Sequence, residues 1–237
     1  MIALITGASG GIGSATARRL ANDGYTVCIH YHDNRERAEE LAHELRGMAV
    51  QADFSDLSDI DRMVTEVTRH YGKIDLLVNN AGESLTGLFQ DISDEAAQRL
   101  FAVNVGGTLH VTKRVLPLML RIQHGCIINV SSVWGEVGAA CEVHYSASKA
   151  AIIGFTKALA KEVGRSGIRV NCVSPGVSDT EMNSAHSGET MQMLAEETPL
   201  ARIGHAEEVA AAIGFLASEQ ARFITGQILP VNGGFNI

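Results

Sequence analysis

Short, almost purely apolar runs alternate with longer amphipathic runs along the whole chain. Several short runs are nearly continuous in Val, Ile and Leu, as expected for strands buried on both faces. The alternation predicts an α/β fold in which a parallel, doubly wound sheet carries helices on both faces. The predicted strands are Ile2–Thr6, Val27–Tyr31, Met48–Gln51, Leu76–Asn79, Cys126–Ser131, Arg169–Val173 and Gln227–Pro230; the predicted helices are Ile12–Asp23, Arg35–Leu45, Ile60–Tyr71, Asp94–Leu120, Tyr145–Val163 and Ala206–Ala217.

Length and composition fit one domain. The chain has 237 residues, 46% of them apolar, and no Pro- or Ser-rich linker divides it. We therefore expect a single domain over residues 1–237. The segment Asp179–Leu200, between the sixth strand and the last helix, is a candidate substrate lid, because ligands bind at that edge of an open α/β sheet. An ordinary surface excursion is the alternative.

Charge and cysteine usage exclude several classes of protein. A net charge of −8 argues against nucleic acid as a partner, because phosphate binding needs a basic face. No apolar run approaches the ~20 residues that span a bilayer, and we read no signal peptide at the N-terminus. The four cysteines lack metal-ligand spacing. We expect a cytoplasmic protein without a structural metal or disulfide.

A glycine-rich turn, Thr6–Gly13, follows the first predicted strand and opens the first helix. Glycines let the backbone approach a pyrophosphate closely, and the helix N-terminus offers N–H donors. A purely structural tight turn is the alternative. The candidate cofactor contacts in this turn are Gly7, Ser9, Gly10, Gly11, Ile12 and Gly13.

The end of the second strand bears on the choice of cofactor. An NAD enzyme places an acid there to bind the ribose 2′-hydroxyl. The strand's last residues carry no acid; Asp33 comes slightly later, and Arg35 could meet a 2′-phosphate. We therefore expect NADP, with NAD possible, and take Tyr31 and Arg35 as candidate contacts. Arg35 could also be an ordinary exposed residue at a helix start.

Polar and small residues follow the third and fourth strands at the same edge. Asp53 could accept a hydrogen bond from the adenine amino group, or it could cap the following turn with Ser55 or Asp56. Small residues after Asn79 would admit a flat ring or ribose, while the Asn amides could tie strands together. The candidate cofactor contacts here are Asp53, Phe54, Asn80, Ala81 and Gly82.

Tyr145 and Lys149 stand four residues apart on a predicted helix, thirteen residues after Ser132. That spacing puts both side chains on one helix face. An ammonium beside a phenol favours the phenolate, so we expect a lowered pKa for Tyr145. Tyr145 is then a candidate proton donor to a substrate oxygen. Such pairs also occur by chance on exposed helices.

Taken in order, T-G-x-x-x-G-I-G, N-N-A-G, Asn104, Ser132, Y-x-x-x-K and Pro175-Gly176 resemble the short-chain dehydrogenase/reductase superfamily over essentially the whole chain. The resemblance implies a seven-stranded Rossmann-type sheet and a homotetramer. It also implies that Tyr145 is the general acid, Lys149 lowers its pKa and holds the nicotinamide ribose, Ser132 binds the substrate carbonyl, and Asn104 positions water. The further cofactor contacts that it implies are Pro175, Gly176, Val177 and Thr180.

Two narrower resemblances suggest substrates. Gly154–Lys157, Arg169–Asn171 and Pro199-Leu200 are similar to the 3-oxoacyl-(acyl-carrier-protein) reductases of fatty acid biosynthesis, although that group's basic carrier-docking positions are Gln123 and Ser166 here. Segments 87–91, 132–135 and 138–143 resemble reductases of 5-aminopentanone on elongation factor P, and Glu142 there would suit an amine-bearing substrate. A non-catalytic NADP(H)-binding module is the alternative of another class.

Overall fold

The computed structural model describes residues 1–180 and 187–236. Within them, seven parallel strands form one sheet in the order β3-β2-β1-β4-β5-β6-β7. All seven lie where the apolar runs predict them, so the predicted fold class is confirmed. The strands are β1 (Ile2–Ile5), β2 (Thr26–Tyr31), β3 (Met48–Gln51), β4 (Leu76–Asn79), β5 (Gly125–Val130), β6 (Ile168–Pro175) and β7 (Ile228–Val231).

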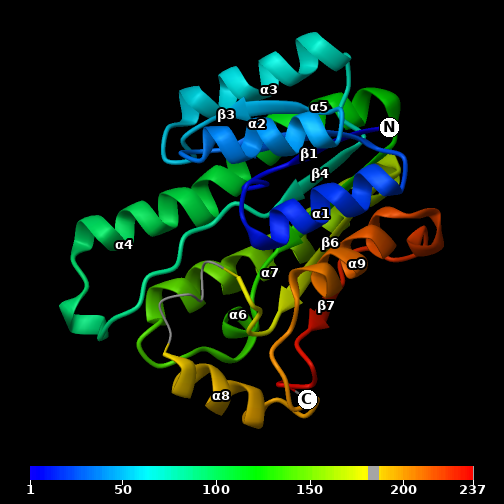
Figure 1. Ribbon diagram of the computed structural model, residues 1–237. Coiled ribbons are helices and arrows are strands. Elements are labelled where there is room, and N and C mark those ends of the chain that lie inside the picture. Colours follow the sequence, from blue (N-terminus) through cyan, green and yellow to red (C-terminus); the bar gives the residue numbers. More distant parts are fainter. Residues whose placement is uncertain (181–186, 237) are drawn as a thin grey trace.

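Helices cover both faces of this sheet (Figure 1). One face packs against α3, α5 and α7, and the other against α1, α2 and α9. The helices are α1 (Gly11–Asn22), α2 (Arg35–Glu44), α3 (Leu57–Tyr71), α4 (Asp94–Phe101), α5 (Thr108–Ile122), α6 (Val133–Val137), α7 (Val143–Val163), α8 (Gly188–Glu197) and α9 (Ala206–Ala217).

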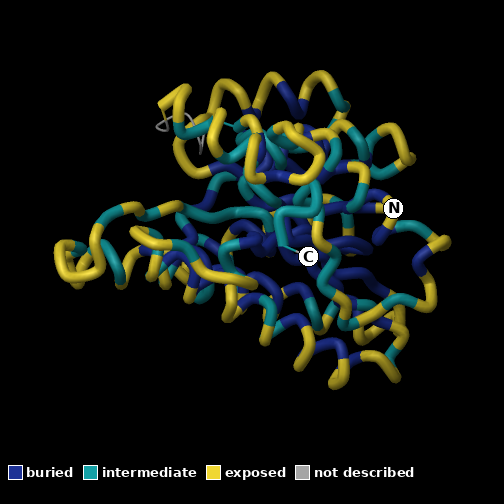
Figure 2. The backbone as a smooth tube through the Cα atoms, turned by 90° about the horizontal axis from the view of Figure 1, so that it is seen from below, coloured by how far each residue is buried: buried dark blue, intermediate teal, exposed yellow. Residues whose placement is uncertain are grey.

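Alternation along each strand divides the core into two layers. Leu4 of β1 belongs to the layer with α3 and α5, whereas its neighbour Ile5 belongs to the layer with α1 and α2. Figure 2 shows the buried strands running through the centre, with exposed backbone on the surrounding helices. Burial on both faces explains why these strands read as continuous apolar runs.

The strand order reverses between β1 and β4, which lie side by side. The chain moves outward from β1 through β2 to β3, and then returns to continue on the other side of β1. Loops at the carboxyl ends of strands diverge at such a point and leave room for a ligand. The predicted site residues follow β1, β4 and β5, so the topology brings them to this edge.

The helix predicted over Asp94–Leu120 is wrong as a single element. Helix α4 ends at Phe101, a π-helix (η2, Ala102–Gly107) follows, and α5 begins at Thr108. A π-helix accommodates an extra residue and is common at functional sites. It contains the predicted site residue Asn104. The apolar period of the sequence continues through the break and therefore does not reveal it.

Two helices lie outside the predicted set. Helix α6 has only five residues, too few for an apolar period to show. Helix α8 lies inside the candidate lid, of which residues 181–186 are outside the described part. Among the described residues, no helix is long and apolar enough to cross a membrane.

Candidate active site

The glycine-rich turn needs glycine at two positions for steric reasons. Gly7 has a φ of +62°, and a Cβ there would lie 2.9 Å from the Ala81 Cα. A Cβ on Gly13 would lie 2.2 Å from the Gly7 carbonyl oxygen. Since real Cβ atoms do not approach backbone this closely, any side chain would displace the turn. The start of α1 therefore packs closely on the turn that follows β1, and this turn packs on Ala81 after β4.

The N-terminus of α1 is open to an anion. Its N-cap residue, Gly10, has no side chain to cap the helix, and the first turn carries no acid. The first N–H groups of a helix lack partners within the helix, and the helix dipole makes this end positive. Backbone donors and positive potential together suit a pyrophosphate.

Asn80 and Thr6 fasten the end of β4 to the end of β1. The Asn80 side-chain amide donates to the carbonyl oxygens of Thr6 and Gly7, at 3.0 Å each. The Thr6 hydroxyl accepts from the backbone N–H of Asn80 and of Ala81, at 2.9 Å each. The structural role that the sequence allowed for these amides is therefore present.

A cavity of about 320 Å³ lies between the turn, β2 and the β3–α3 connection. Its wall also contains residues that were not among the predicted contacts, including His30, His32 and Arg99. Arg99 forms an ion pair with Glu83 at 2.8 Å, so its charge is partly neutralised. The predicted cofactor residues that line it are Gly7, Ser9, Gly10, Asp53, Phe54, Ala81 and Gly82.

Two predicted cofactor residues lie elsewhere. The Tyr31 side chain is buried in the core layer between the sheet and helices α1 and α2. The Arg35 side chain is 73% exposed and pairs with Glu39 one helical turn away, at 2.7 Å. Neither is among the residues that line the cavity. Tyr31 is only 8% exposed and Arg35 is paired with Glu39, so both stay predictions as cofactor contacts.

The Asp53 carboxylate is largely occupied by its own loop. Its Oδ1 accepts from the Ser55 N–H at 2.8 Å and from the Ser55 hydroxyl at 2.7 Å. Its Oδ2 lies 3.6 Å from His32 Nε2. Burial raises the pKa of Asp53, but the bonds from Ser55 and the nearby His32 outweigh it and leave the pKa lowered. Asp53 therefore stays ionised at the cavity wall.

Ser132, Tyr145 and Lys149 line a second, smaller cavity of about 150 Å³. Ser132 caps α6, where its hydroxyl accepts from the Trp134 N–H. Tyr145 and Lys149 both lie on α7 and are 7% and 5% exposed. The spacing of four does bring them together, since Lys149 Nζ is 5.6 Å from the centre of the Tyr145 ring.

The neighbouring Ser131 is engaged differently from Ser132. Its hydroxyl donates to the backbone carbonyl of Lys149 at 2.8 Å and so ties β5 to α7. Lys149 Nζ donates to the Val130 carbonyl at 3.1 Å. The end of β5 thereby fixes both the backbone and the ammonium of Lys149.

The expected lowering of the Tyr145 pKa is wrong for this structure. Burial raises the pKa of Tyr145 to about 12, with a smaller contribution from the Glu142 carboxylate, while a hydrogen bond with Ser132 acts in the opposite direction. Burial also lowers the pKa of Lys149 to about 8. For both groups, desolvation outweighs the attraction between a Tyr145 phenolate and the Lys149 ammonium. Tyr145 is therefore a neutral phenol at pH 7 and has a proton to give.

The side chain of Asn104, in the π-helix, is held by Glu83 and Ser148. Its side-chain oxygen accepts from the Glu83 N–H at 2.8 Å, and its amide donates to the Glu83 carbonyl and to Ser148 Oγ. A Cβ on Gly82 would lie 3.2 Å from Asn104 Oδ1 and 3.3 Å from Lys149 Nζ. Gly82 thus leaves a small gap where Asn104 and Lys149 face each other.

The comparisons with known proteins agree with this geometry. A family model of the short-chain dehydrogenases/reductases, described as enoyl-(acyl carrier protein) reductase, matches residues 7–236. The chain belongs to the short-chain dehydrogenase/reductase family. The resemblance seen in the sequence motifs is therefore confirmed, and the protein is an NAD(P)H-dependent oxidoreductase.

Similar members of this family differ in what their names say. The uncharacterized oxidoreductase YmfI of Bacillus subtilis is 42% identical over 99% of this chain and 98% of its own. A 3-oxoacyl-(acyl-carrier-protein) reductase of Staphylococcus aureus is 39% identical over 98% and 96%. A crystal structure named ribose-5-phosphate isomerase, from Brucella melitensis, superimposes with a TM-score of 0.93 at 33% identity, covering 99% and 92%. One fold carries several named reactions, so substrate must be argued from the site.

The segment after β6 closes the smaller cavity from the side. Pro175, Gly176, Val177 and Thr180 all line it. A Cβ on Gly11 would lie 2.8 Å from the Thr180 methyl, so this segment packs directly on the first turn of α1. Among the predicted cofactor residues, Ile12 and Asn80 line this cavity too.

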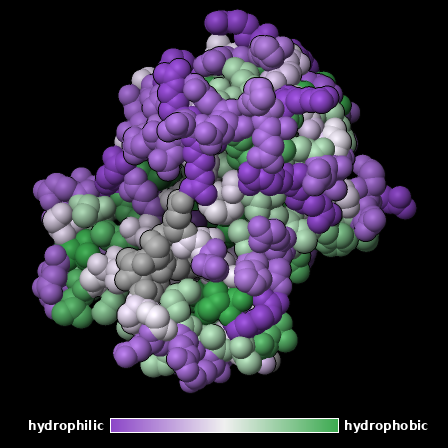
Figure 3. All heavy atoms as spheres, in the orientation of Figure 1, coloured by the Kyte–Doolittle hydropathy of each residue, from purple (hydrophilic) through white to green (hydrophobic). Residues whose placement is uncertain are grey.

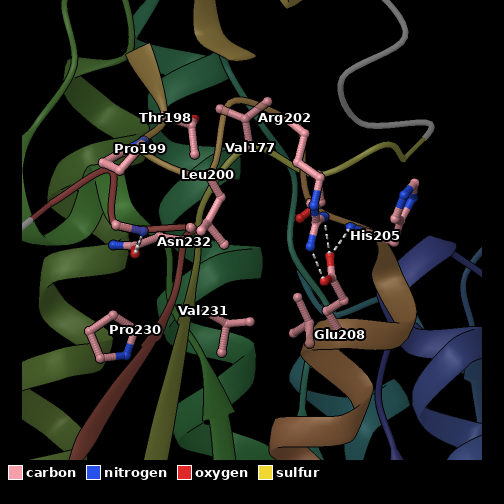
Figure 4. A pocket seen from close by; sticks show the side chains of 15 residues that line it. Val177, Thr198, Pro199, Leu200, Arg202, His205, Glu208, Pro230, Val231 and Asn232 are labelled. Carbon is pink, nitrogen blue, oxygen red and sulfur yellow. Dashed lines mark hydrogen bonds and ion pairs between the residues drawn. The ribbon is translucent and has the colours of Figure 1, made fainter. Parts of the chain in front are cut away.

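A larger cavity of about 460 Å³ lies beside this short-chain dehydrogenase/reductase site (Figure 4). It shares Val177 and Ser178 with the smaller cavity but contains none of the predicted catalytic residues. Arg202 and Glu208 form an ion pair across its wall, and Leu200 from the end of the candidate lid also lines it. Size alone thus does not mark the active site.

The described part of the chain also contains cysteines and potential metal ligands. Among the described residues, no cluster of His, Cys, Asp and Glu could hold a metal ion. All four cysteines are free: Cys28, Cys126 and Cys172 are buried, and Cys141 is exposed. Burial raises the pKa of the three buried thiols, which keeps them protonated.

Burial of Lys149 predicts a stability cost that can be measured. The pKa of Lys149 falls from 10.5 to about 8, so folding disfavours its charged form. We expect Lys149→Met to raise the free energy of unfolding at pH 7 by about 1–3 kcal/mol. Between pH 8 and 10.5 the unfolded wild-type chain holds a proton that the folded chain releases, so wild-type stability rises and the difference shrinks. Urea unfolding of both proteins from pH 7 to pH 10 measures this. A difference that stays constant with pH would contradict it.

Proposed function

We propose that this protein is an NADPH-dependent ketone reductase in which Tyr145 is the proton donor. The observation that carries the proposal is the buried grouping of Ser132, Tyr145 and Lys149 beside the open N-terminus of α1. A protonated phenol next to a hydroxyl donor suits a ketone oxygen that gains negative charge.

The chain's own residues fit a dinucleotide. The glycine turn and the open start of α1 would hold the pyrophosphate, and the cavity lined by Asp53 and Phe54 would take the adenosine end. Lys149 and Asn80 would lie against the nicotinamide ribose in the smaller cavity. When bound, the reduced nicotinamide supplies the hydride that the ketone carbon accepts.

The remaining chemistry falls to four side chains. Ser132 would donate a hydrogen bond to the ketone oxygen, and Tyr145 would transfer its phenolic proton to the developing alkoxide. Lys149 would stabilise the resulting phenolate, because its Nζ lies 5.6 Å from the centre of the Tyr145 ring. Asn104 faces Lys149 across Gly82 and would hold the water that restores the proton to Tyr145. The raised pKa of Tyr145 keeps its proton in place until the alkoxide forms.

Preference for NADPH gives a testable role to Arg35. Its pair with Glu39 is exposed to solvent, and exposed pairs of this kind stabilise a protein little. A 2′-phosphate can therefore displace Glu39. We expect Arg35→Ala to raise the dissociation constant of NADPH roughly tenfold while NADH changes less than about twofold. Fluorescence titration with both cofactors measures this. Arg37→Ala, on the same helix, serves as the matched control; equal losses for NADPH and NADH would dismiss Arg35.

A 3-oxoacyl thioester is the substrate class that we favour. The proteins from Staphylococcus aureus and Thermotoga maritima named 3-oxoacyl-(acyl-carrier-protein) reductase are each 39% identical to this chain. Figure 3 shows more hydrophobic surface around α8 and the segment before α4 than over α2 and α3. The exposed apolar residues there include Leu88, Phe89 and Met193. An apolar acyl chain fits such a surrounding. Arg121 and Arg165 would receive an acidic carrier protein.

An amine-bearing ketone, as on 5-aminopentanone-modified elongation factor P, is a second candidate. The observation that favours it is that Glu142 lines the same cavity as Tyr145. A carboxylate there would attract an ammonium and repel an anionic chain. We expect Glu142→Gln to raise the KM of an aminoketone about 5- to 10-fold. A neutral ketone of equal length is the matched substrate; an equal change for both would remove this candidate.

The decisive experiment for the activity is NADPH oxidation by purified protein with acetoacetyl-CoA and, separately, with an aminoketone. Turnover of the first favours the thioester, and turnover of the second alone favours the amine-bearing ketone. Binding of NADPH without turnover of any ketone would instead favour a non-catalytic NADP(H)-binding module. We also expect a homotetramer, as the family resemblance implies, which light scattering measures.

A further inference from the structure

His30 is a buried polar residue at the carboxyl end of β2, and none of the roles above uses it. It is 2% exposed, and both of its ring nitrogens have partners. The Gly7 backbone N–H donates to Nδ1 at 2.9 Å, and Nε2 lies 3.0 Å from the Ala52 carbonyl oxygen. The Ala8 N–H also donates to the His30 carbonyl at 2.9 Å.

These partners fix the protonation state of the ring. A backbone N–H can only donate and a carbonyl can only accept, so Nδ1 must carry a lone pair and Nε2 must carry the hydrogen. Burial agrees with this, since it lowers the pKa of His30 to about 4 and keeps the ring neutral at pH 7. A doubly protonated ring would set a hydrogen on Nδ1 against the hydrogen of Gly7.

The ring also connects two segments that belong to different parts of the site. The His30 ring packs against the Phe54 ring in a tilted arrangement, with ring centres 4.5 Å apart. Phe54 in turn packs against Gly107 at the end of the π-helix, where a Cβ would lie 2.6 Å from the Phe54 ring. His30 therefore lies between the glycine turn on one side and the Ala52–Phe54 segment on the other. Both segments line the 320 Å³ cavity.

We propose that His30 is a positioning residue for the cofactor, which holds the glycine turn and the Ala52–Phe54 segment at the separation that the adenosine end requires. It acts through the Nδ1 lone pair on Gly7 and the Nε2 hydrogen on Ala52. The proposal rests on the NADPH site proposed above. His30 would thus hold the glycine turn in place through its side chain, without taking part in the reaction.

Two isosteric substitutions separate the two bonds. In His30→Asn, the amide oxygen takes the place of Nδ1 and can still accept from Gly7. In His30→Gln, the amide nitrogen takes the place of Nε2 and can still donate to Ala52, but the Gly7 N–H loses its acceptor. Each variant removes one bond and leaves a buried polar group, so loss of stability alone does not distinguish them.

We expect NADPH to bind His30→Asn within about threefold of wild type and His30→Gln at least about tenfold more weakly. At saturating NADPH, kcat should be unchanged in both, since neither touches Ser132, Tyr145 or Lys149. Fluorescence titration at pH 7 measures binding independently of turnover. Equal affinities in the two variants would overturn the role of the Gly7 bond. If wild type itself fails to bind NADPH, it is the proposed function that fails.

A second measurement does not depend on the variants folding. NMR of the imidazole nitrogens in the wild-type protein reports which of them carries hydrogen. The proposal requires hydrogen on Nε2 of His30 and none on Nδ1 at pH 7. A ring protonated at Nδ1 could not accept from Gly7 and would overturn the proposal.

Discussion

Replacing Tyr145 with phenylalanine should reduce the rate of ketone reduction by about 10³-fold or more while leaving the protein folded. The substitution removes one oxygen atom from a side chain that is 7% exposed and keeps the ring that packs in the cavity. Because the proton donor is lost, the developing alkoxide keeps only the hydrogen bond from Ser132 and receives no proton. Single-turnover oxidation of NADPH with a saturating ketone measures the chemical step directly.

Cofactor binding is the control for Tyr145→Phe. The glycine turn, Asn80 and Lys149 are untouched, so the NADPH dissociation constant should change less than about threefold. Ser132→Ala should also slow the reaction, but less, because Tyr145 remains to donate the proton. A Tyr145→Phe protein that turns over a ketone at more than about a tenth of the wild-type rate would remove Tyr145 from the chemistry.

Gly13→Ala should be the most damaging single-methyl substitution in the cofactor turn. The added Cβ would lie 2.2 Å from the Gly7 carbonyl oxygen and 2.7 Å from the Ala8 Cα, both of which are backbone. Relief requires that α1 move away from β1, which costs about 3 kcal/mol or more and disorders the pyrophosphate site. Thermal unfolding and NADPH titration measure the two effects.

A second glycine-to-alanine change provides the comparison. Gly164 follows α7 with a φ of −57°, and a Cβ there would meet no atom within 4 Å. Gly164→Ala should therefore change the free energy of unfolding by less than about 1 kcal/mol and leave NADPH affinity unaltered. If Gly13→Ala is as stable as Gly164→Ala and binds NADPH normally, the close approach at Gly13 has no importance for the site.

The sheet and most of its helices are predictable from the sequence because each strand is buried on both faces. The apolar runs around Ile29 and Ile127 must be buried on both faces. Their alternation with amphipathic helices indicates a parallel sheet covered by helices on both sides. The break at η2 is different. Gly107, at its end, packs against Phe54 from a distant loop, and no local sequence pattern records such a contact.

The candidate site shows the same division. Spacing alone places Tyr145 and Lys149 on one face of α7, as the structure confirms. Their pKa values do not follow from spacing, because burial depends on Val130, Ser132 and the other elements that close the cavity. Tyr31 shows that position along a strand does not fix where a side chain lies: it ends β2 at the ligand edge, but its side chain packs in the core layer with α1 and α2. His30, one residue earlier, faces the turn and could have been suggested by that same alternation.

Substrate identity lies beyond the fold. A solved structure with a TM-score of 0.93 is named for an isomerase, while relatives of similar identity are named for ketone reduction on a carrier. Residues that line the catalytic cavity, such as Glu142, therefore carry more information about the substrate than the sheet does.

Transfer of deuterium from specifically labelled NADPH tests the central claim most directly. The protein is incubated with NADPH deuterated at the transferable ring position, with acetoacetyl-CoA in one reaction and an aminoketone in another, and the products are examined by mass spectrometry. We predict that at least one ketone gains deuterium on its new carbinol carbon, and that Tyr145→Phe abolishes the transfer. Wild-type protein that binds NADPH but transfers deuterium to neither ketone would contradict the account.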